Sequence, residues 1–235
     1  MSEFFKLPRL YADHDLTEGA CIPLADGQAH YLNAVLRHKP GDALRLFNGR
    51  QGEWLAKIGD LSKKSGTALL QQQIHPQPTE VRRLHLIFAP IKKHRMDWLI
   101  EKAVELGATD LHPVLTQNTE VRKINEERLR QQIFEAAEQC ERFIIPALHP
   151  LEKLETKLAA WPKDTSVLAC LERFDARPLA YTPDPVALLI GPEGGFTSEE
   201  KERIAATCDP VTLGETVLRC ETAAAVGLTL LGYPR

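Results

Sequence analysis

A run of glycines follows a buried, strand-like segment in the second half of the chain. Val186–Ile190 is wholly apolar, and Gly191-Pro192-Glu193-Gly194-Gly195 comes directly after it. Ligands of α/β proteins bind beyond the carboxyl ends of strands, and glycine lets the backbone approach a ligand closely. The run lacks the lysine of a phosphate loop and the spacing of a dinucleotide turn. It predicts a ligand site built from backbone groups, although a plain glycine-rich turn would have the same composition.

A second segment brings charged side chains to the start of the last predicted helix. Val211–Gly214 predicts a short strand and turn, and Leu218-Arg219-Cys220-Glu221-Thr222-Ala223 then enters an apolar helix. Thr222 is placed to cap that helix, and Glu221 to accept from its free N–H groups. Either Arg219 and Glu221 simply form a local ion pair, or this segment and the glycine run form the two walls of one pocket.

An α/β scaffold is needed to hold these segments. The predicted strands are short and apolar, and the predicted helices show apolar residues at helical spacing. These elements cover residues 84–89, 96–107, 129–140, 166–171 and 186–190. Strands that alternate with helices indicate a mainly parallel sheet. The final helix, at 222–231, is apolar nearly all round, so we expect it inside the domain or in a subunit interface.

The first part of the chain has a different pattern. Ala43–Phe47 and Gly52–Ile58 alternate on either side of Asn48-Gly49, which is a strong hairpin signal. A short helix is predicted over His30–Arg37. Short strands with one small helix indicate a small barrel, and a polar, proline-containing linker follows at 71–80. The predicted domains are residues 1–75 and 76–235.

Composition narrows the class of protein. The chain has 235 residues with a net charge of −3, so any nucleic-acid surface must be a local basic patch. No apolar run approaches the roughly 20 residues of a membrane span, and Met1–Lys6 does not resemble a signal peptide. We therefore expect a cytoplasmic location. The five cysteines form no CxxC pair and the eight histidines no metal-ligand spacing, which predicts neither a disulfide framework nor a metal site.

The two segments together resemble the signature of the SPOUT methyltransferases, and more narrowly that of the RsmE family. Ile190–Phe196 matches the family pattern Ile-Gly-Pro-Glu-Gly-Gly-Phe throughout. The other matches are Leu213-Gly214, Leu218-Arg219, Glu221-Thr222-Ala223, Arg95-Met96-Asp97, Glu138-Gln139, Arg142 and Phe47-Asn48-Gly49-Arg50. Thr216 stands where the family usually has arginine, and Glu141 where it usually has glycine.

The resemblance implies a fold and an activity. The fold is an α/β, SPOUT-type, trefoil-knotted and mainly parallel sheet domain, preceded by a small PUA-like β-barrel that binds RNA. The family is a homodimer that uses S-adenosylmethionine, without a metal, to methylate N3 of a uridine near the 3′ end of 16S rRNA in the 30S subunit. By resemblance, the cofactor is bound by Ile190, Gly191, Pro192, Glu193, Gly194, Gly195, Leu213, Gly214, Leu218, Arg219, Thr222 and Ala223.

Uridine N3 carries an imide proton that must leave before the nitrogen can accept a methyl group. Arg219 is the first candidate to stabilise the resulting negative charge on O2 and O4, and Glu221 to orient it or accept the proton. N3 lies on the Watson–Crick edge, so the base must be unpaired or flipped. The candidate RNA-binding residues, through phosphate contacts, are Arg9, Arg37, Arg95 and Arg142, with Lys6, Arg45 and Arg50 as further cations of the barrel.

Three other functions fit parts of the sequence. A SPOUT methyltransferase that acts on another rRNA or tRNA position would share the glycine run and the apolar last helix. A non-catalytic RNA-binding protein could use the same fold, but it would not need the intact glycine run. A general α/β nucleotide-binding enzyme is disfavoured because the phosphate-loop lysine is missing.

Overall fold

The structure of the chain is a computed structural model that describes residues 4–183 and 185–232. The chain forms two compact units. The first contains the residues up to Glu80 together with Ala137–Ile145, and the second contains Val81–Ala136 with the residues from Pro146 onward. The first unit therefore takes in residues 76–80 and the segment 137–145, which the predicted boundary after residue 75 assigns to the second domain.

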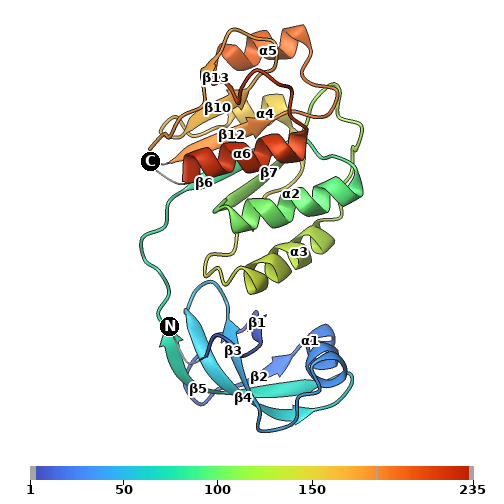
Figure 1. Cartoon of the computed structure of the whole chain (residues 1–235), viewed down its shortest axis with the longest axis vertical. Helices are drawn as coiled ribbons and strands as arrows, with labels where there is room; N and C mark the ends of the chain where they lie inside the picture. The colour runs from blue at the N-terminus through green and yellow to red at the C-terminus, as the bar shows by residue number, and fades with distance from the viewer. Residues whose placement is uncertain (1–3, 184, 233–235) are drawn as a thin grey trace. The chain divides into compact units, whose positions relative to one another are not determined.

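Strands and a short helix make up the first unit (Figure 1). Its elements are β1 (Arg9–Tyr11), β2 (Cys21–Leu24), α1 (Asp26–His30), the π-helical turn η1 (Tyr31–Val35), β3 (Ala43–Phe47), β4 (Glu53–Leu61) and β5 (Gly66–His75). The strands form one sheet in the order β1-β3-β4-β5-β2. The predicted hairpin around Asn48-Gly49 is confirmed, since β3 and β4 pair antiparallel. The predicted helix at 30–37 begins earlier, at Asp26, and ends at Val35.

The core of the first unit lies on one face of this sheet. In β4 and β5, buried isoleucine, leucine and alanine side chains alternate with half-buried and exposed positions, as expected when one sheet face is covered, whereas in β3 the residues from Leu44 to Phe47 are all buried. The fully buried residues include Leu44, Leu46, Ala56, Ile58, Ala68 and Leu70. Leu32 of η1 belongs to the same cluster, which explains why the short helix packs against the sheet.

The second unit alternates strands with helices. Its elements are β6 (Leu84–Phe88), α2 (Lys93–Glu105), β7 (Asp110–Leu115), α3 (Glu126–Gln139), β8 (Ala147–Leu148), β9 (Glu152–Lys153), α4 (Leu154–Ala159), β10 (Ser166–Cys170), β11 (Arg177–Pro178), β12 (Val186–Ile190), α5 (Ser198–Ala205), β13 (Asp209–Thr212) and α6 (Cys220–Gly232). The last turn of α3 belongs to the first unit. The sheet order is β11-β13-β10-β12-β6-β7-β8, with β9 beside β7, and every pair is parallel.

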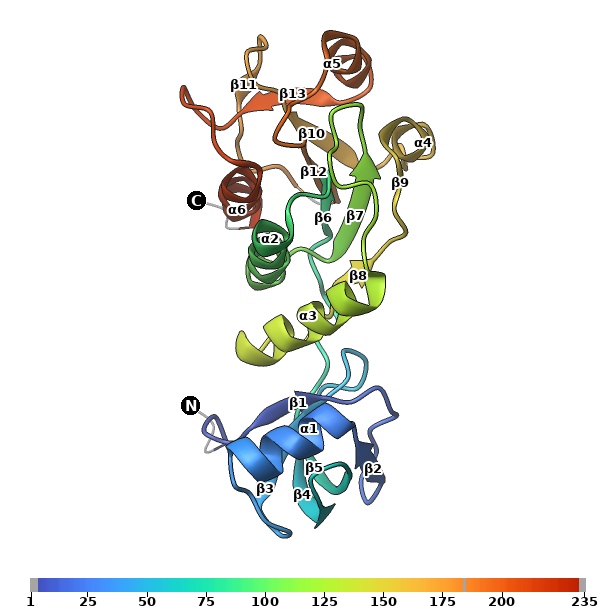
Figure 2. The ribbon, with the colours of Figure 1, turned by 90° about the vertical axis from the view of Figure 1, so that its right-hand side faces the viewer.

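Helices cover both faces of this parallel sheet. Figure 2 shows α2 and α6 on one face, and α4 and α5 on the other. The close approach of α6 to β12 depends on Gly227, because a Cβ atom there would lie 2.5 Å from a methyl group of Leu188. In the part of the chain that the structure describes, no helix has the length and apolar character to cross a membrane. The apolar α6 is instead a packed element of the second unit.

Candidate cofactor-binding and catalytic site

The glycine run forms the turn between β12 and α5. The aromatic ring of Phe196 folds back against Gly191, where a Cβ atom would lie 2.8 Å from the ring. Gly195 adopts a positive φ of 65°, which favours glycine. The side-chain amide of Asn118, beyond β7, donates to the carbonyl oxygens of Gly194 and Gly195 at 3.1 and 3.0 Å. The conformation of the turn is therefore fixed in part by the loop after β7, which the sequence motif did not reveal.

A capping box fixes the start of α5 behind the turn. The hydroxyl of Thr197 accepts from the backbone N–H of Glu200 at 3.2 Å, and the Glu200 carboxylate accepts from the N–H of Thr197 at 2.9 Å. Glu200 is buried and also accepts from the N–H of Gln117 at 2.8 Å. These hydrogen bonds fix the end of the glycine turn that leads into α5, so the backbone of the turn is preorganised for a ligand.

A cavity of about 460 Å³ opens between the glycine turn and the segment that follows β13. Its volume lies within the usual range for small-molecule sites. The predicted cofactor-binding residues in its lining are Ile190, Gly191, Pro192, Gly195, Leu213, Gly214, Leu218 and Ala223. The prediction that the two segments form the walls of one pocket is thus met by the geometry.

Predicted cofactor residues that lie outside the cavity lining are Glu193, Gly194, Arg219 and Thr222. The structure corrects the predicted cap, because α6 begins at Cys220 and Thr222 already lies inside its first turn. The backbone carbonyl of Arg219 accepts from the N–H of Ala223 at 2.8 Å, and the helix starts two residues earlier than predicted.

The sequence analysis did not identify one wall of the cavity. Residues Cys170–Arg173, which follow β10, line it together with Lys201 of α5. β10 pairs with both β12 and β13, so its carboxyl end must face the same space. Burial raises the pKa of the Cys170 thiol to about 12, which leaves this thiol un-ionised and unreactive. The strand-end rule would have located this wall had it been applied to 166–171.

Arg95 of α2 meets two carboxylates, Glu193 and Glu221, that directly follow the cavity-lining residues Pro192 and Cys220. Its guanidinium is 3.8 Å from a Glu193 carboxylate oxygen and 3.7 Å from a Glu221 oxygen. Among the described residues, Arg95 Nε and Glu221 Oε2 are buried atoms without a hydrogen-bond partner. Buried polar atoms left without partners are uncommon and often belong to binding sites. The structure thus joins Arg95, predicted to bind RNA, with Glu221, predicted to act in catalysis.

Arg219 is exposed at the rim of the same region. Within the described residues its side chain makes no hydrogen bond or ion pair, so the alternative of a local pair with Glu221 is not met there. Glu221 pairs with Arg95 instead. The guanidinium of Arg219 is therefore available to a ligand or substrate.

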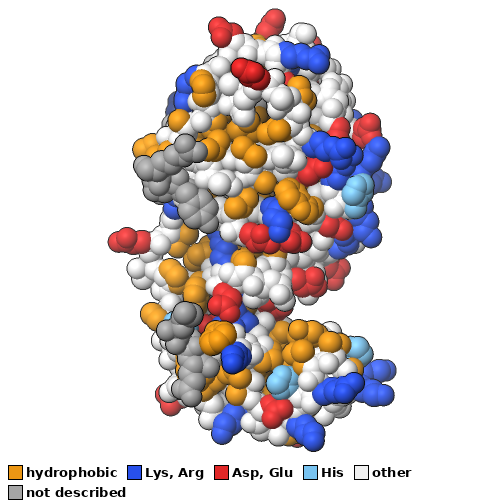
Figure 3. Space-filling view, viewed as in Figure 1, with side chains coloured by type: hydrophobic (Ala, Val, Ile, Leu, Met, Phe, Trp, Pro, Cys, Tyr) orange, Lys and Arg blue, Asp and Glu red, His pale blue; other side chains and the backbone are white. Residues whose placement is uncertain are grey.

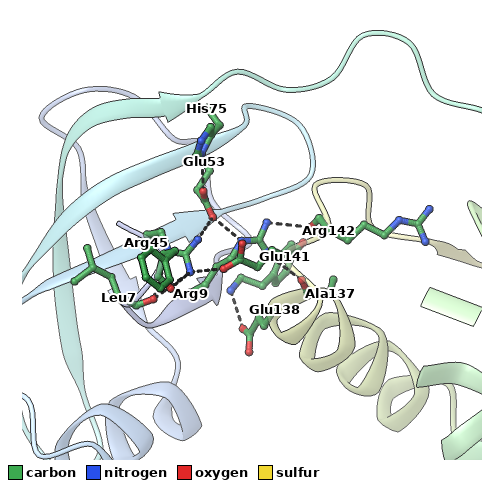
Figure 4. A network of polar contacts seen from close by, with 11 residues as sticks. Leu7, Arg9, Arg45, Glu53, His75, Ala137, Glu138, Glu141 and Arg142 are labelled. Atoms are coloured by element: carbon green, nitrogen blue, oxygen red, sulfur yellow. Dashed lines mark hydrogen bonds and ion pairs between the residues drawn. The ribbon is translucent and has the colours of Figure 1, made fainter. Parts of the chain in front are cut away.

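Arg9 is buried inside the first unit, which corrects the prediction that it contacts RNA. Its guanidinium lies against the ring of Phe47 and donates to the Glu53 carboxylate at 2.5 Å and to the Ala137 carbonyl at 2.8 Å. The Arg9 and Glu53 side chains are each only 2% exposed (Figure 4). A buried guanidinium with these partners cannot reach a phosphate.

Arg45 belongs to the same buried network and is likewise removed from the RNA surface. Its guanidinium lies 3.5 Å from Glu53 and 2.7 Å from Glu141, and its side chain is 5% exposed. Glu141, the position where the resembled family usually has glycine, has a positive φ of 56° and pairs with Arg45. That pair compensates for the strain of a non-glycine residue in this conformation.

The remaining predicted RNA-binding residues are Arg37 and Arg142. Arg37 is exposed directly after η1 with a φ of 60°. Arg142 is half-buried, its backbone carbonyl accepts from Arg9 at 3.0 Å, and its side chain points away from the Arg9 network in Figure 4. Burial lowers the pKa of Arg142 to about 10, which still leaves the guanidinium charged at neutral pH.

A larger cavity of about 650 Å³ lies between α4 and α5. None of the predicted catalytic or cofactor residues lines it, and its lining is mainly apolar. Its charged rim residues Glu155 and Arg203 pair with each other at 2.6 Å. The smaller cavity, which meets the glycine turn, is therefore the better candidate for the chemistry.

Family models match both parts of the chain. A model of an RNA methyltransferase domain matches residues 77–232, and a model of an RNA methyltransferase PUA domain matches residues 24–71. The chain belongs to the RNA methyltransferase domain family. The predicted fold class, a SPOUT-type α/β domain preceded by a small PUA-like unit, is confirmed, and the chain is an RNA methyltransferase.

Individual relatives agree with the family match. The chain is similar to the ribosomal RNA small subunit methyltransferase E of Rickettsia conorii, at 34% identity over 93% of this chain and 92% of that protein. Among solved structures it is similar to a Legionella pneumophila methyltransferase in complex with the bound cofactor SAM, with a TM-score of 0.84, 29% identity and coverage of 95% and 96%. It is also similar to the ribosomal RNA small subunit methyltransferase E of Neisseria gonorrhoeae bound to S-adenosyl methionine, with a TM-score of 0.83, 29% identity and the same coverage.

Proposed function

We propose that this RNA methyltransferase transfers the methyl group of S-adenosylmethionine to N3 of one uridine near the 3′ end of 16S rRNA, in the 30S subunit. The observation that carries the proposal is the cavity between the glycine turn and residues 213–223, with Arg95 and Glu221 beside it. Relatives that are named ribosomal RNA small subunit methyltransferase E support the choice of substrate.

The cavity fits S-adenosylmethionine in its chemistry. Its lining carries acidic and basic side chains, namely Glu172, Glu215, Arg173 and Lys201, beside the apolar Phe196. The amino-acid end of the cofactor carries both an ammonium and a carboxylate, and its adenine needs an apolar slot. Close backbone approach at Gly191 suits a ligand that is read by peptide N–H and C=O groups. When bound, the cofactor supplies an electrophilic methyl group.

We assign the proton chemistry to residues beside this cavity. The imide proton of uridine N3 must be removed, and Glu221 is placed to accept it or to orient the acceptor. Arg219, which is exposed and unpaired among the described residues, would stabilise the negative charge on the uracil oxygens. Arg95 would orient Glu221, since their 3.7 Å separation is an ion-pair distance that can tighten when the substrate binds.

We assign the RNA-binding surface to exposed cations. Arg37 lies just after η1, and Tyr31 and Val35 of η1 and the following Leu36 are exposed apolar side chains. Aromatic and apolar side chains beside cations are typical of single-stranded RNA contacts. Figure 3 shows hydrophobic side chains over this part of the first unit. Lys6 and Arg50, which are exposed, and the half-buried Arg142 are further candidates, and binding should weaken steeply as salt rises.

We infer a homodimer that works in the cytoplasm. Trp98 of α2 and Val217, which precedes α6, are exposed apolar side chains, and Figure 3 shows hydrophobic side chains on the face of α2 and α6. An apolar face of this kind suits an interface with a second copy of the chain. Ribosome biogenesis, to which methylation of 16S rRNA belongs, takes place in the cytoplasm of bacteria.

The test is a methylation assay on RNA that lacks the modification. 30S subunits and naked 16S rRNA from a strain without this gene would be incubated with the protein and labelled S-adenosylmethionine. The modified nucleotide would then be mapped by nuclease digestion and mass spectrometry. We expect one methyluridine near the 3′ end of 16S rRNA. Labelling of a ribose, or of a tRNA only, would instead support a SPOUT methyltransferase with another target.

A further inference from the structure

Parallel pairing of β6 and β7 brings a group of imidazoles and a carboxylate together, away from the cofactor cavity. His85 lies near the start of β6 and is opposite Asp110, the first residue of β7. His112 follows two residues later on β7, so its side chain shares a face with Asp110. These strand ends lie at the amino edge of the sheet, whereas the glycine turn follows the carboxyl end of β12.

The distances in this group match those between ligands of one metal ion. His85 Nδ1 lies 3.2 Å from His112 Nε2 and 3.5 Å from Asp110 Oδ2. The ligand atoms of all three residues lie within 4.8 Å of one another. A tetrahedral zinc ion with bonds of about 2.0–2.1 Å separates its ligands by roughly 3.3 Å. A single N–H of His85 cannot point well at both neighbours, but a cation between them would satisfy all three.

Neighbouring side chains support the same geometry. His149 Nε2 lies 2.9 Å from Asp110 Oδ1, which leaves the other carboxylate oxygen facing His85. Such an outer hydrogen bond is the usual way in which proteins orient a carboxylate ligand. Trp161 packs edge-on against the rings of His85 and His112, at centroid distances of 5.5 and 5.1 Å. The indole limits rotation of both imidazoles.

The charge of the nearest cation is balanced locally. Lys157 is paired with Glu152 at 2.6 Å, which reduces its repulsion of a bound metal ion.

We propose that His85, Asp110 and His112 bind one zinc ion at the amino edge of the sheet, with the fourth coordination position open to water. Two imidazoles and one carboxylate are a common set of protein ligands for zinc. His112 is buried, but His85 and Asp110 are half-buried, so the ion and its water can reach the site from solvent. The sequence analysis predicted no metal site, because His85 and Asp110 are far apart in the chain and only the strand register brings them together.

The test uses untagged full-length protein, stripped with a chelator and titrated with ZnCl2 against a chromophoric zinc chelator. We expect one zinc per chain. His85→Ala and Asp110→Asn should each weaken binding by at least about 100-fold, and His149→Ala by about 10-fold, the typical effect of losing an outer partner. His38→Ala is the matched control, because His38 and Asp42 form an exposed pair at 3.0 Å without a third ligand. Circular dichroism of each metal-free variant checks its fold.

A second readout locates the ion. Co²⁺ in place of Zn²⁺ should give the intense visible absorption of four-coordinate cobalt and should quench the fluorescence of Trp161, which contacts two of the ligands. Loss of both signals in His85→Ala, with both kept in His38→Ala, would support the site. Zinc binding equal in the wild type and in a folded His85→Ala variant would overturn it. Failure of the wild type to bind zinc would also overturn it and would leave His85 and His112 as a hydrogen-bonded pair.

Discussion

Replacing Glu53 by glutamine should destabilise the first unit more than any exposed charge substitution in it. The Glu53 side chain is 2% exposed and is the shared partner of Arg9 at 2.5 Å, Arg45 at 3.5 Å and His75 at 2.9 Å. The amide would keep the shape but leave two buried guanidinium groups without their common counter-charge. Breaking a buried ion pair from one side costs about 3–5 kcal/mol.

The assay is urea unfolding followed by tryptophan fluorescence. The protein has three tryptophans, and Trp54 of β4 is the one in the first unit. Replacing Trp98 and Trp161 by phenylalanine makes Trp54 the reporter of that unit. With a slope of about 2 kcal/mol per M urea, the midpoint should fall by about 2 M.

Two variants make the reasoning refutable. Asp13→Asn is the control, because Asp13 pairs with Arg50 at 3.5 Å on the surface and such pairs contribute at most about 1 kcal/mol. Arg9→Met should destabilise less than Glu53→Gln, since Glu53 keeps Arg45 and His75 as partners. If Glu53→Gln shifted the midpoint no further than Asp13→Asn does, the network would not hold the first unit together.

Three further predictions concern the second unit. Gly191→Ala should weaken S-adenosylmethionine binding about tenfold or more in calorimetry, because the new Cβ would push the ring of Phe196, now 2.8 Å away, out of place; unchanged affinity would show that the turn adapts. Arg219→Ala should lower single-turnover methyl transfer by about 10²–10³-fold with little change in cofactor affinity, whereas equal losses of both would make Arg219 structural. Hydrogen bonding from Arg128 lowers the pKa of Asp97, so this pair stabilises the fold above the unfolded-state pKa and loses its effect as pH falls through the lower folded-state value. The stability difference between wild type and Asp97→Asn, measured by denaturant unfolding from about pH 6 to about pH 3, should therefore shrink toward low pH, and a constant difference would contradict this.

Local sequence predicted the parts of the site that are local in the chain. The glycine turn is encoded by five consecutive residues after a buried strand, and the hairpin around Asn48-Gly49 by its turn residues and alternation. Strands of two residues, such as β9 and β11, were missed because so short a segment carries no periodicity. The start of α6 was placed two residues late because Thr222 has the residue type of a helix cap, although it lies inside the first turn.

Long-range contacts were the part that the sequence could not supply. Arg9 looked like a surface cation, but it packs on Phe47, pairs with Glu53 and donates to Ala137 of the segment that returns to the first unit. Arg95 and Glu221 are distant in the chain, and the packing of α2 against α6 brings them together. The sequence alone does not distinguish a buried, paired arginine from an exposed one. Burial in the fold assigns Arg9 and Arg45 a structural role and leaves exposed arginines such as Arg37 and Arg219 for contacts with RNA or substrate.

The most direct test of the proposed function is the position of the methyl group on the RNA. Primer extension on 16S rRNA, before and after treatment with the protein and S-adenosylmethionine, reports this at single-nucleotide resolution, because a methyl group on N3 blocks the Watson–Crick edge and stops reverse transcriptase. We predict one new stop at a uridine near the 3′ end, with N3-methyluridine in the digested RNA. Methyl transfer without such a stop, with the label on a ribose instead, would contradict the proposal.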